Sequence, residues 1–184
     1  ITEAHAVLLE SAAIAGKGTD NEPKGILHTT GIGEVAMGTN GAAISWKKVV
    51  ELETKVNSVN ANRGRMAYLT NAKVFGALKT TEKATGSGRF IMEDAAAGRC
   101  NGYVTEFSNL VPSNLTKGSG SNLSAMIFGN FQDLYIGQWG GLDIVVDPYT
   151  SKKTAEIEIC LNAWNDVLVA EPKSFAAIKD IVTE

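Results

Sequence analysis

The stretch that decides the fold is residues 125–175, which read AMIFGNFQDLYIGQWGGLDIVVDPYTSKKTAEIEICLNAWNDVLVAEPKSF. Apolar and polar residues alternate in two runs within it, residues 142–147 and residues 155–164. A period of two is typical of a β-strand with one buried face. A polar segment that begins at Pro148 joins the two runs. We therefore expect a long β-hairpin whose tip, residues 148–154, is exposed and cationic.

One face of this expected hairpin is acidic. Its carboxylates belong to Asp143, Asp147, Glu156 and Glu158. Like charges that face each other across a β-ladder repel, so the stripe needs an explanation. Two interpretations are open: the stripe is a solvated face, or a basic surface of another chain or of a further part of this protein covers it.

Composition excludes several classes of protein. The chain has 184 residues, of which 44% are hydrophobic and 20% charged, enough for one sizeable core or two small subdomains that share it. Its net charge of -3 gives no support to a nucleic-acid-binding surface. No apolar run approaches the length of about 20 residues that a membrane-spanning helix needs.

The cysteines and the first residue bear on the origin of the chain. Cys100 and Cys160 lie far apart, each in an apolar, strand-like context. We expect two buried, reduced thiols rather than a disulfide, which fits a cytosolic origin. The chain starts at Ile1 in what reads as the middle of a helix, so we expect a fragment of a longer protein.

The rest of the sequence predicts a mixture of helices and strands. We expect helices over residues 1–15, 45–59 and 72–83, with Ser45 capping the second and Thr70 or Asn71 the third. Pro172 is expected to open a terminal helix over residues 173–182. Residues 113–122 are rich in Gly and Ser and predict an exposed, mobile loop. Short strands are expected at residues 26–28, 34–37, 66–70, 102–107, 125–128, 134–138 and 167–169. This order indicates an α+β fold.

Patterns that would indicate a ligand site are weak. Residues 31–36 match the dinucleotide pattern G-x-G-x-x-A, but Gly38 and Gly41 follow too closely for the helix that such a site needs. His5 and His28 lie in no cluster with metal-ligand spacing. Catalytic patterns are equally weak, because no nucleophile elbow is present and the carboxylates near residue 20 fit a polar turn.

The aromatic residues give no binding platform in the sequence. Trp46, Trp139 and Trp164 are too scattered to predict a surface for stacked bases. Together with the weak ligand patterns, this leads us to expect no catalytic, cofactor-binding or metal-binding residues and no cofactor.

The order and spacing of several segments resemble the major capsid protein family of tailed bacteriophages, which has the Hong Kong 97-type fold. Val104 stands where that family often has proline, and Asn130 where it usually has an acidic residue. The segments that carry the resemblance are residues 15–27, 46–59, 67–71, 88–90, 102–112, 128–131 and 171–175.

The resemblance implies an α+β, Hong Kong 97-like architecture. Residues 1–29 would be the end of a spine helix and the loop after it, and residues 30–138 the axial domain. Residues 139–166 would be the hairpin of the peripheral domain, with the spine helix on its apolar face. Residues 167–184 would be a return strand and terminal helix of the axial domain.

The resemblance also implies a function. The protein would be a structural subunit, not an enzyme, that self-assembles in the bacterial host cytoplasm into an icosahedral virion shell around DNA. Its partners would be copies of itself around five-, six- and three-fold axes, a scaffolding segment or protease during assembly, and DNA held without sequence-specific contacts, with no membrane. The implied subunit-contact residues are the tip and the acidic stripe: Tyr149, Thr150, Ser151, Lys152, Lys153, Asp143, Asp147, Glu156 and Glu158.

Two other functions remain open. The same fold would suit the shell protein of an encapsulin-type nanocompartment, which holds cargo enzymes. An unrecognised enzyme is a further alternative, and it would require a pocket with convergent polar groups.

Overall fold

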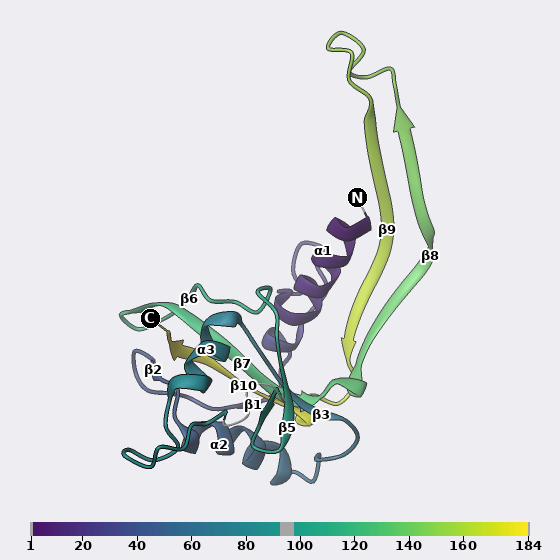
Figure 1. Ribbon diagram of the computed structural model, residues 1–184. Helices are drawn as coiled ribbons and strands as arrows, with labels where there is room; N and C mark the ends of the chain where they lie inside the picture. The colour runs from purple at the N-terminus through teal and green to yellow at the C-terminus, as the bar shows by residue number, and fades with distance from the viewer. Residues whose placement is uncertain (1, 93–97, 184) are drawn as a thin grey trace.

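The structure is a computed structural model that describes residues 2–92 and 98–183. Within these residues, eight strands form a mixed sheet with the order β1-β10-β7-β3-β5-β4, while β2 pairs with β10 and β6 pairs with β7 (Figure 1). The strands of this sheet are β1 (Gly33–Glu34), β2 (Ala42–Ala43), β3 (Met66–Thr70), β4 (Arg99–Cys100), β5 (Tyr103–Phe107), β6 (Leu115–Lys117), β7 (Gly120–Asn130) and β10 (Phe175–Val182).

Strand β7 lies at the centre of this sheet. It pairs in antiparallel fashion with β10 on one side and with β3 on the other. Met126 and Phe128 belong to one hydrophobic cluster, whereas Ala125 and Ile127 belong to a second. Because successive residues of a strand point to opposite faces, both faces of the sheet are covered.

Two helices contribute to the first cluster. Helix α2 (Trp46–Asn57) buries Val49, Leu52 and Val56, and α3 (Ala72–Thr80) buries Val74 and Leu78. These are apolar stripes with helical spacing, so the two helix predictions are confirmed.

The polar contacts of these helices agree in part with the prediction. Asn71 caps α3, because its side chain accepts a hydrogen bond from the Val74 backbone N–H at 3.0 Å. Ser45 occupies the N-cap position of α2 but makes no side-chain capping bond. The buried Tyr68 hydroxyl donates to the Val49 carbonyl at 3.2 Å, and burial raises the pKa of Tyr68.

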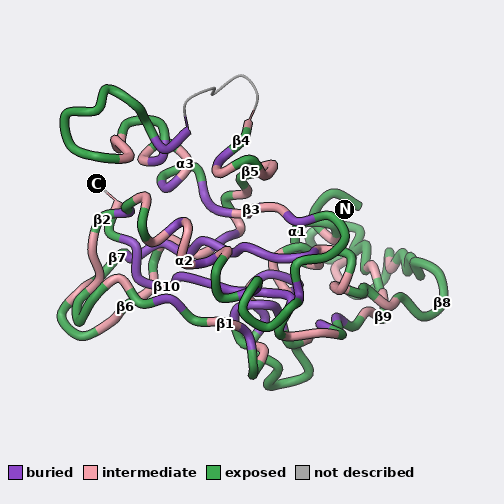
Figure 2. The backbone as a smooth tube through the Cα atoms, turned by 90° about the horizontal axis from the view of Figure 1, so that it is seen from below, coloured by how far each residue is buried: buried purple, intermediate pink, exposed green. Residues whose placement is uncertain are grey.

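Helix α1 (Thr2–Ala15) lies over the second cluster. Ile14 packs there with Phe175 and with the short 3-10 helix η1 (Ile26–His28). Figure 2 shows that the buried backbone is concentrated in β7, β10 and their neighbours. The core therefore lies almost entirely in the sheet domain, and Val169 contributes to it from outside the sheet.

A second, two-stranded sheet projects from this core (Figure 1). It consists of β8 (Leu134–Asp147) and β9 (Glu158–Val169), which pair in antiparallel fashion. This is the long hairpin that the alternation of apolar and polar residues predicted. Its first strand starts at Leu134 and continues without a break past residue 138, where the expected hairpin domain begins.

The predicted terminal helix is wrong. Residues 175–182 form strand β10, and Pro172 opens only the 3-10 turn η3 (Pro172–Ser174). Phe175 and Ala177 face one cluster, while Ala176 and Ile178 face the other. A strand that is buried on both faces has a continuous apolar run, which sequence periodicity does not separate from a buried helix.

Two shorter predictions also need correction. Residues 113–122, expected to be a mobile loop, contain β6 and the start of β7, joined through a turn at Gly118 with φ +58°. Asn40 holds this turn, since its side-chain oxygen accepts from the Ser119 N–H at 3.1 Å. Residues 26–28 form η1 rather than a strand.

The same substitution at two glycines tests the packing of the central strand. A Cβ at Gly129 would lie 2.6 Å from the Ser174 carbonyl oxygen, whereas a Cβ at Gly76 of α3 would meet nothing within 4 Å. We expect Gly129→Ala to lower the free energy of unfolding by about 2–3 kcal/mol through overpacking. Gly76→Ala, the control, should raise it by about 0.5–1 kcal/mol. Urea denaturation measures both, and equal effects would contradict the assigned packing.

Candidate functional site: the long hairpin

The hairpin is anchored at its base by two short turns. Asn130 at the end of β7 caps η2 (Phe131–Asp133): its side-chain oxygen accepts from the Gln132 N–H at 3.3 Å. The Asp133 carbonyl then accepts from the Ala170 N–H at 2.9 Å, where β9 ends. The first bond orders the segment between β7 and the hairpin, and the second joins the two ends of the hairpin to each other.

The register gives the hairpin two distinct faces. Ile144 lies opposite Leu161, while Asp147 lies opposite Glu158. The pairing shifts between Trp139 and Asp143, which contain Gly140 with φ +73°. Distal to this irregularity, the apolar and polar faces are those that the alternation predicted.

Hydroxyl and amide groups surround the carboxylates near the tip. Asp147 accepts hydrogen bonds from the Tyr149 N–H at 2.7 Å and from the Thr150 N–H and hydroxyl. The Thr150 hydroxyl, followed by these two backbone N–H groups, lowers the pKa of Asp147. The Ser151 hydroxyl similarly donates to Glu158. These local bonds give both carboxylates hydrogen-bond donors from the turn itself.

The structure brings most of the predicted contact residues together. Asp143, Asp147 and Glu158 share one face of the ladder. Glu156 does not, because β9 begins only at Glu158, and Glu156 accepts a hydrogen bond from Thr154 in the turn. The tip residues Tyr149, Thr150, Ser151, Lys152 and Lys153 form the connection between the strands, and Tyr149 is 78% exposed. Whether any of these residues contacts another subunit stays a prediction.

The expectation of a buried hairpin face is wrong for this chain. Ile144, Val146 and Ile159 of the apolar face are all more than half exposed. Helix α1 reaches only the base, where Val167 and Val169 are buried and His5 Nε2 lies 2.9 Å from Asn165 Nδ2. The distal part of the apolar face therefore has no cover among the described residues.

The two cysteines differ in their surroundings. Both are free thiols, as expected. Cys100 is buried, and burial raises its pKa to about 12. Cys160 is exposed, which contradicts the expectation that it is buried, because it lies on the uncovered hairpin.

Sequence reasoning missed a pair of aromatic residues. Trp139 and Trp164 were judged too scattered to act together, yet they lie directly opposite each other in the hairpin ladder. The hairpin prediction contained the signal that could have found them, because the ladder register determines which residues face each other.

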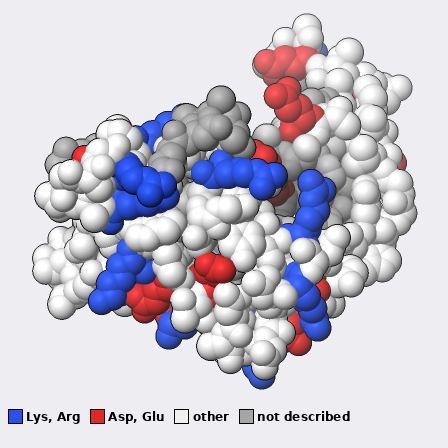
Figure 3. Space-filling view, turned by 60° about the horizontal axis from the view of Figure 1, so that its bottom comes forward, with Lys and Arg blue, Asp and Glu red and all other residues white. Residues whose placement is uncertain are grey.

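Charge is distributed unevenly over the molecule. Residues 134–170 contain five acidic and two basic side chains, which account for the whole net charge of -3. Residues 46–92 contain nine basic and three acidic side chains. Figure 3 shows acidic side chains near the end of the hairpin and Lys and Arg side chains spread over the body.

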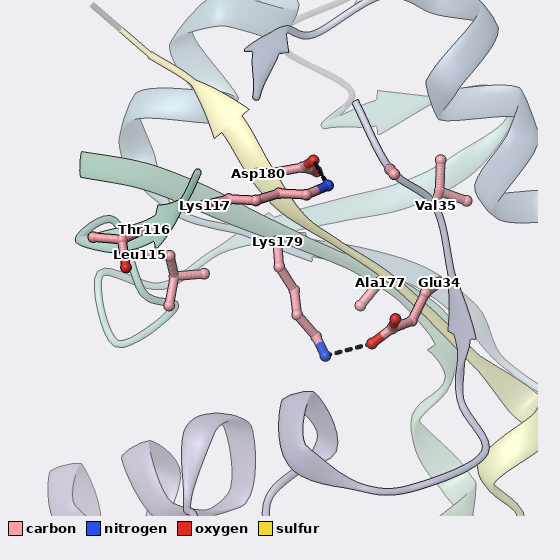
Figure 4. Close-up of a pocket in the computed structure, with 9 residues that line it drawn as sticks. Glu34, Val35, Leu115, Thr116, Lys117, Ala177, Lys179 and Asp180 are labelled. Atoms are coloured by element: carbon pink, nitrogen blue, oxygen red, sulfur yellow. Dashed lines mark hydrogen bonds and ion pairs between the residues drawn. The ribbon is translucent and has the colours of Figure 1, made fainter. Parts of the chain in front are cut away.

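A cavity of about 300 Å³ lies beside β10 and is lined by both acidic and basic side chains (Figure 4). Its charged groups form two pairs: Lys179 Nζ lies 2.7 Å from Glu34, and Lys117 Nζ lies 2.6 Å from the buried Asp180. Asp180 also accepts hydrogen bonds from the Met37 N–H at 3.0 and 3.1 Å. These contacts tie β6 and the segment after β1 to β10, which is a structural role.

The described residues contain no metal-binding cluster, membrane-spanning helix or dinucleotide site. Nowhere in residues 2–92 and 98–183 do three His, Cys, Asp or Glu side chains gather closely enough to hold a metal ion. In the same parts of the chain, no helix has the length and apolar character needed to cross a membrane. Residues 31–36 include strand β1 rather than the start of a helix, so the dinucleotide pattern is not a site.

Comparison with solved structures defines the class of fold. The chain matches a capsid chain of an empty GTA particle with a TM-score of 0.73 and 22% identity, over 98% of this chain and 64% of that one. It also matches the SrpI encapsulin complex from Synechococcus elongatus PCC 7942 with a TM-score of 0.62 and 15% identity, over 98% of this chain and 62% of that one. The fold is therefore the Hong Kong 97-like fold of capsid and encapsulin shells, as the sequence implied.

Sequence comparison defines the family. The model of the phage capsid family matches residues 1–180. The chain is also 31% identical over 162 residues to the major capsid protein of Halomonas phage phiHAP-1, which covers 88% of this chain and 24% of that protein. This chain belongs to the phage capsid family.

The turn at Asp147 gives a prediction about pH. Thr150→Val removes the hydroxyl that does most to lower the pKa of Asp147, so this pKa should rise towards its ordinary value while the two backbone bonds keep it from reaching it. An NMR titration of the carboxyl carbon measures the change. Thr154→Val, which removes a hydroxyl that contacts Glu156 instead, should leave the pKa of Asp147 unchanged.

The sign of the effect on stability follows. A carboxyl whose pKa is lower in the folded state stabilises the fold above its unfolded pKa and loses this effect as the pH falls through the folded pKa. The local stability of the turn should therefore depend less on acidic pH in Thr150→Val than in the parent. An Asp147 pKa that does not move would contradict the assigned hydrogen bond.

Proposed function

We propose that the protein containing this chain is the major capsid subunit of a tailed phage or prophage. Many copies would close into an icosahedral shell around DNA, without sequence-specific contacts to it. The observation that carries the proposal is the match of the phage capsid family to nearly the whole chain. The chain spans 24% of the curated relative and 64% of the capsid chain that it matches, so the function of the complete protein is an inference from this part.

The hairpin supports a role in assembly. It exposes large apolar side chains on both faces, for example Ile144 on one and Trp164 on the other. Exposed apolar surface of this extent marks a region that another molecule, or a further part of the same protein, covers. A subunit that repeats around symmetry axes provides such contacts.

The architecture implied by the family gives these contacts a place. Residues 30–138 would lie near the five- and six-fold axes, the hairpin of residues 139–166 at the periphery, and its tip near three-fold axes. Residues 1–29 would continue a spine helix, and residues 167–184 would return to the axial domain as strands. A scaffolding segment or a protease would act during assembly in the bacterial host cytoplasm, and the product would be the virion.

A non-enzymatic role accompanies this proposal. The charged groups that line the cavity beside β10 are engaged with one another, as with Lys117 and Asp180, so they offer no convergent set for a substrate. A screen of small molecules by thermal shift addresses the enzyme alternative, because a substrate or cofactor would raise the melting temperature.

Direct observation of the assembly state tests the proposal. The complete protein should form closed particles tens of nanometres across in electron micrographs and elute near the void volume in size exclusion. A stable monomer or dimer would remove the capsid function. An encapsulin-type shell is the second candidate, supported by the fold match to the SrpI encapsulin complex, and particles that enclose protein cargo rather than DNA would establish it.

The tip gives a second prediction. Lys152→Glu together with Lys153→Glu should lower the yield of assembled particles, because the change reverses the only two basic side chains of residues 134–170. Both side chains are exposed, so the melting temperature of the unassembled subunit should stay the same. The double change to Arg, which keeps the charge, is the control. Unchanged particle yield in the Glu variant would rule out a contact by the tip.

A further inference from the structure

The hairpin carries an aromatic patch on the same face as the acidic stripe but nearer the base than the tip. Trp139 lies opposite Trp164, and Tyr135 lies opposite Leu168. These four residues, called here the indole patch, alternate along their strands with residues such as Ile136 and Val169, which lie on the side of α1. The indole patch therefore lies on the other face of the hairpin base.

One of the two indoles packs against the local backbone. A Cβ at Gly137 would lie 3.0 Å from Cη2 of Trp139, so one edge of the Trp139 ring lies over Gly137. Beside the two indoles is a hollow of about 610 Å³, which the loop residues Asn21, Glu22 and Pro23 also line.

The aromatic rings of the indole patch are largely exposed. Trp164 is 75% exposed, Trp139 59% and Tyr135 58%. Because a buried aromatic side chain covers about 150–250 Å², these three expose on the order of 400 Å². That area is about half of what each partner contributes to a standard protein interface. The patch is thus large enough to form the centre of a contact, with the surrounding hairpin surface as its rim.

Charge indicates what covers the patch. Asp143 and Asp166 lie on the same face as the indoles. Asp143 lies nearer the tip than the patch, and Asp166 lies between Trp164 and Leu168. The whole net charge of -3 lies in residues 134–170, whereas residues 46–92 of the same chain have six more basic than acidic side chains. The hairpin of one copy and the body of another are therefore complementary in charge, and many copies meet in the shell proposed above.

We propose that the indole patch is the apolar centre of the contact between this hairpin and a second copy of the chain. Trp139 and Trp164 contribute most of the affinity, and the acidic groups around them orient the two copies. This inference rests on the proposed shell function. It adds where the affinity lies: at the base of the hairpin rather than at its tip.

Alanine substitutions in the complete protein test the proposal. Trp139→Ala and Trp164→Ala should each raise the protein concentration needed for assembly by about tenfold or more, as expected for a central aromatic contact. The matched control is Phe107→Ala in β5, which removes an aromatic ring of similar exposure to Trp139 from a part of the molecule outside the hairpin. It should change this concentration by less than about threefold. The unassembled variants and the parent should have the same melting temperature, because each of these rings is exposed in this chain.

Fluorescence provides a readout in particles that still assemble. Replacing Trp46 by Phe leaves Trp139 and Trp164 as the indoles of these 184 residues, and any tryptophan elsewhere in the complete protein is replaced by Phe as well. Burial against a second copy should shift their emission to shorter wavelengths as particles form. An unshifted emission in assembled particles, or alanine variants that assemble at the parental concentration, would overturn the proposal while the shell function stands. A complete protein that remains monomeric would overturn both.

Discussion

The pairing of β7 with β10 is the constraint on which the rest of the structure depends. Gly129 lies opposite Phe175 in this ladder, and the absence of a side chain at Gly129 leaves room for the phenylalanine ring. The hairpin begins five residues after Gly129, at Leu134, and its second strand ends at Val169, shortly before Phe175. The two ends of the hairpin are therefore fixed by adjacent positions of one ladder, and the hairpin has a defined direction from the sheet.

The molecule therefore has a sheet domain with a buried core and a hairpin that is mostly exposed. The sheet buries both of its faces, so its stability is provided within the chain. The hairpin has only its own ladder, the two turns at its base and the contact with α1 near Asn165. Two-stranded sheets are marginal in water on their own, so an uncovered hairpin of this length gains stability when another surface covers it. Folding of the sheet and ordering of the hairpin by neighbours would then be separable steps.

Much of the fold was predictable because several elements have a clear period. The stripes of α2, the Asn71 cap of α3 and the alternation in β8 and β9 each depend on residues that are close in sequence. The terminal strand was not predictable in this way. Its apolar run is equally compatible with a buried helix, and the pairing partner that decides between them, β7, lies about 50 residues earlier.

In the candidate site, too, some features could be predicted from local sequence and others could not. The acidic stripe could be predicted from alternation alone, but the pairing of Trp139 with Trp164 could not, because it requires the ladder register across the tip and the shift after Trp139. Likewise, the apolar residues of the hairpin indicated a buried face, although only its base is buried in this chain.

The sequence by itself determined the family, the three helices, the long hairpin and its polar and apolar faces, since these depend on motif order and local period. Only the tertiary structure decided that residues 175–182 pair as a strand, that α1 covers just the hairpin base, and that two distant indoles meet. Those outcomes depend on contacts between segments far apart in the chain, for which a local pattern carries no information.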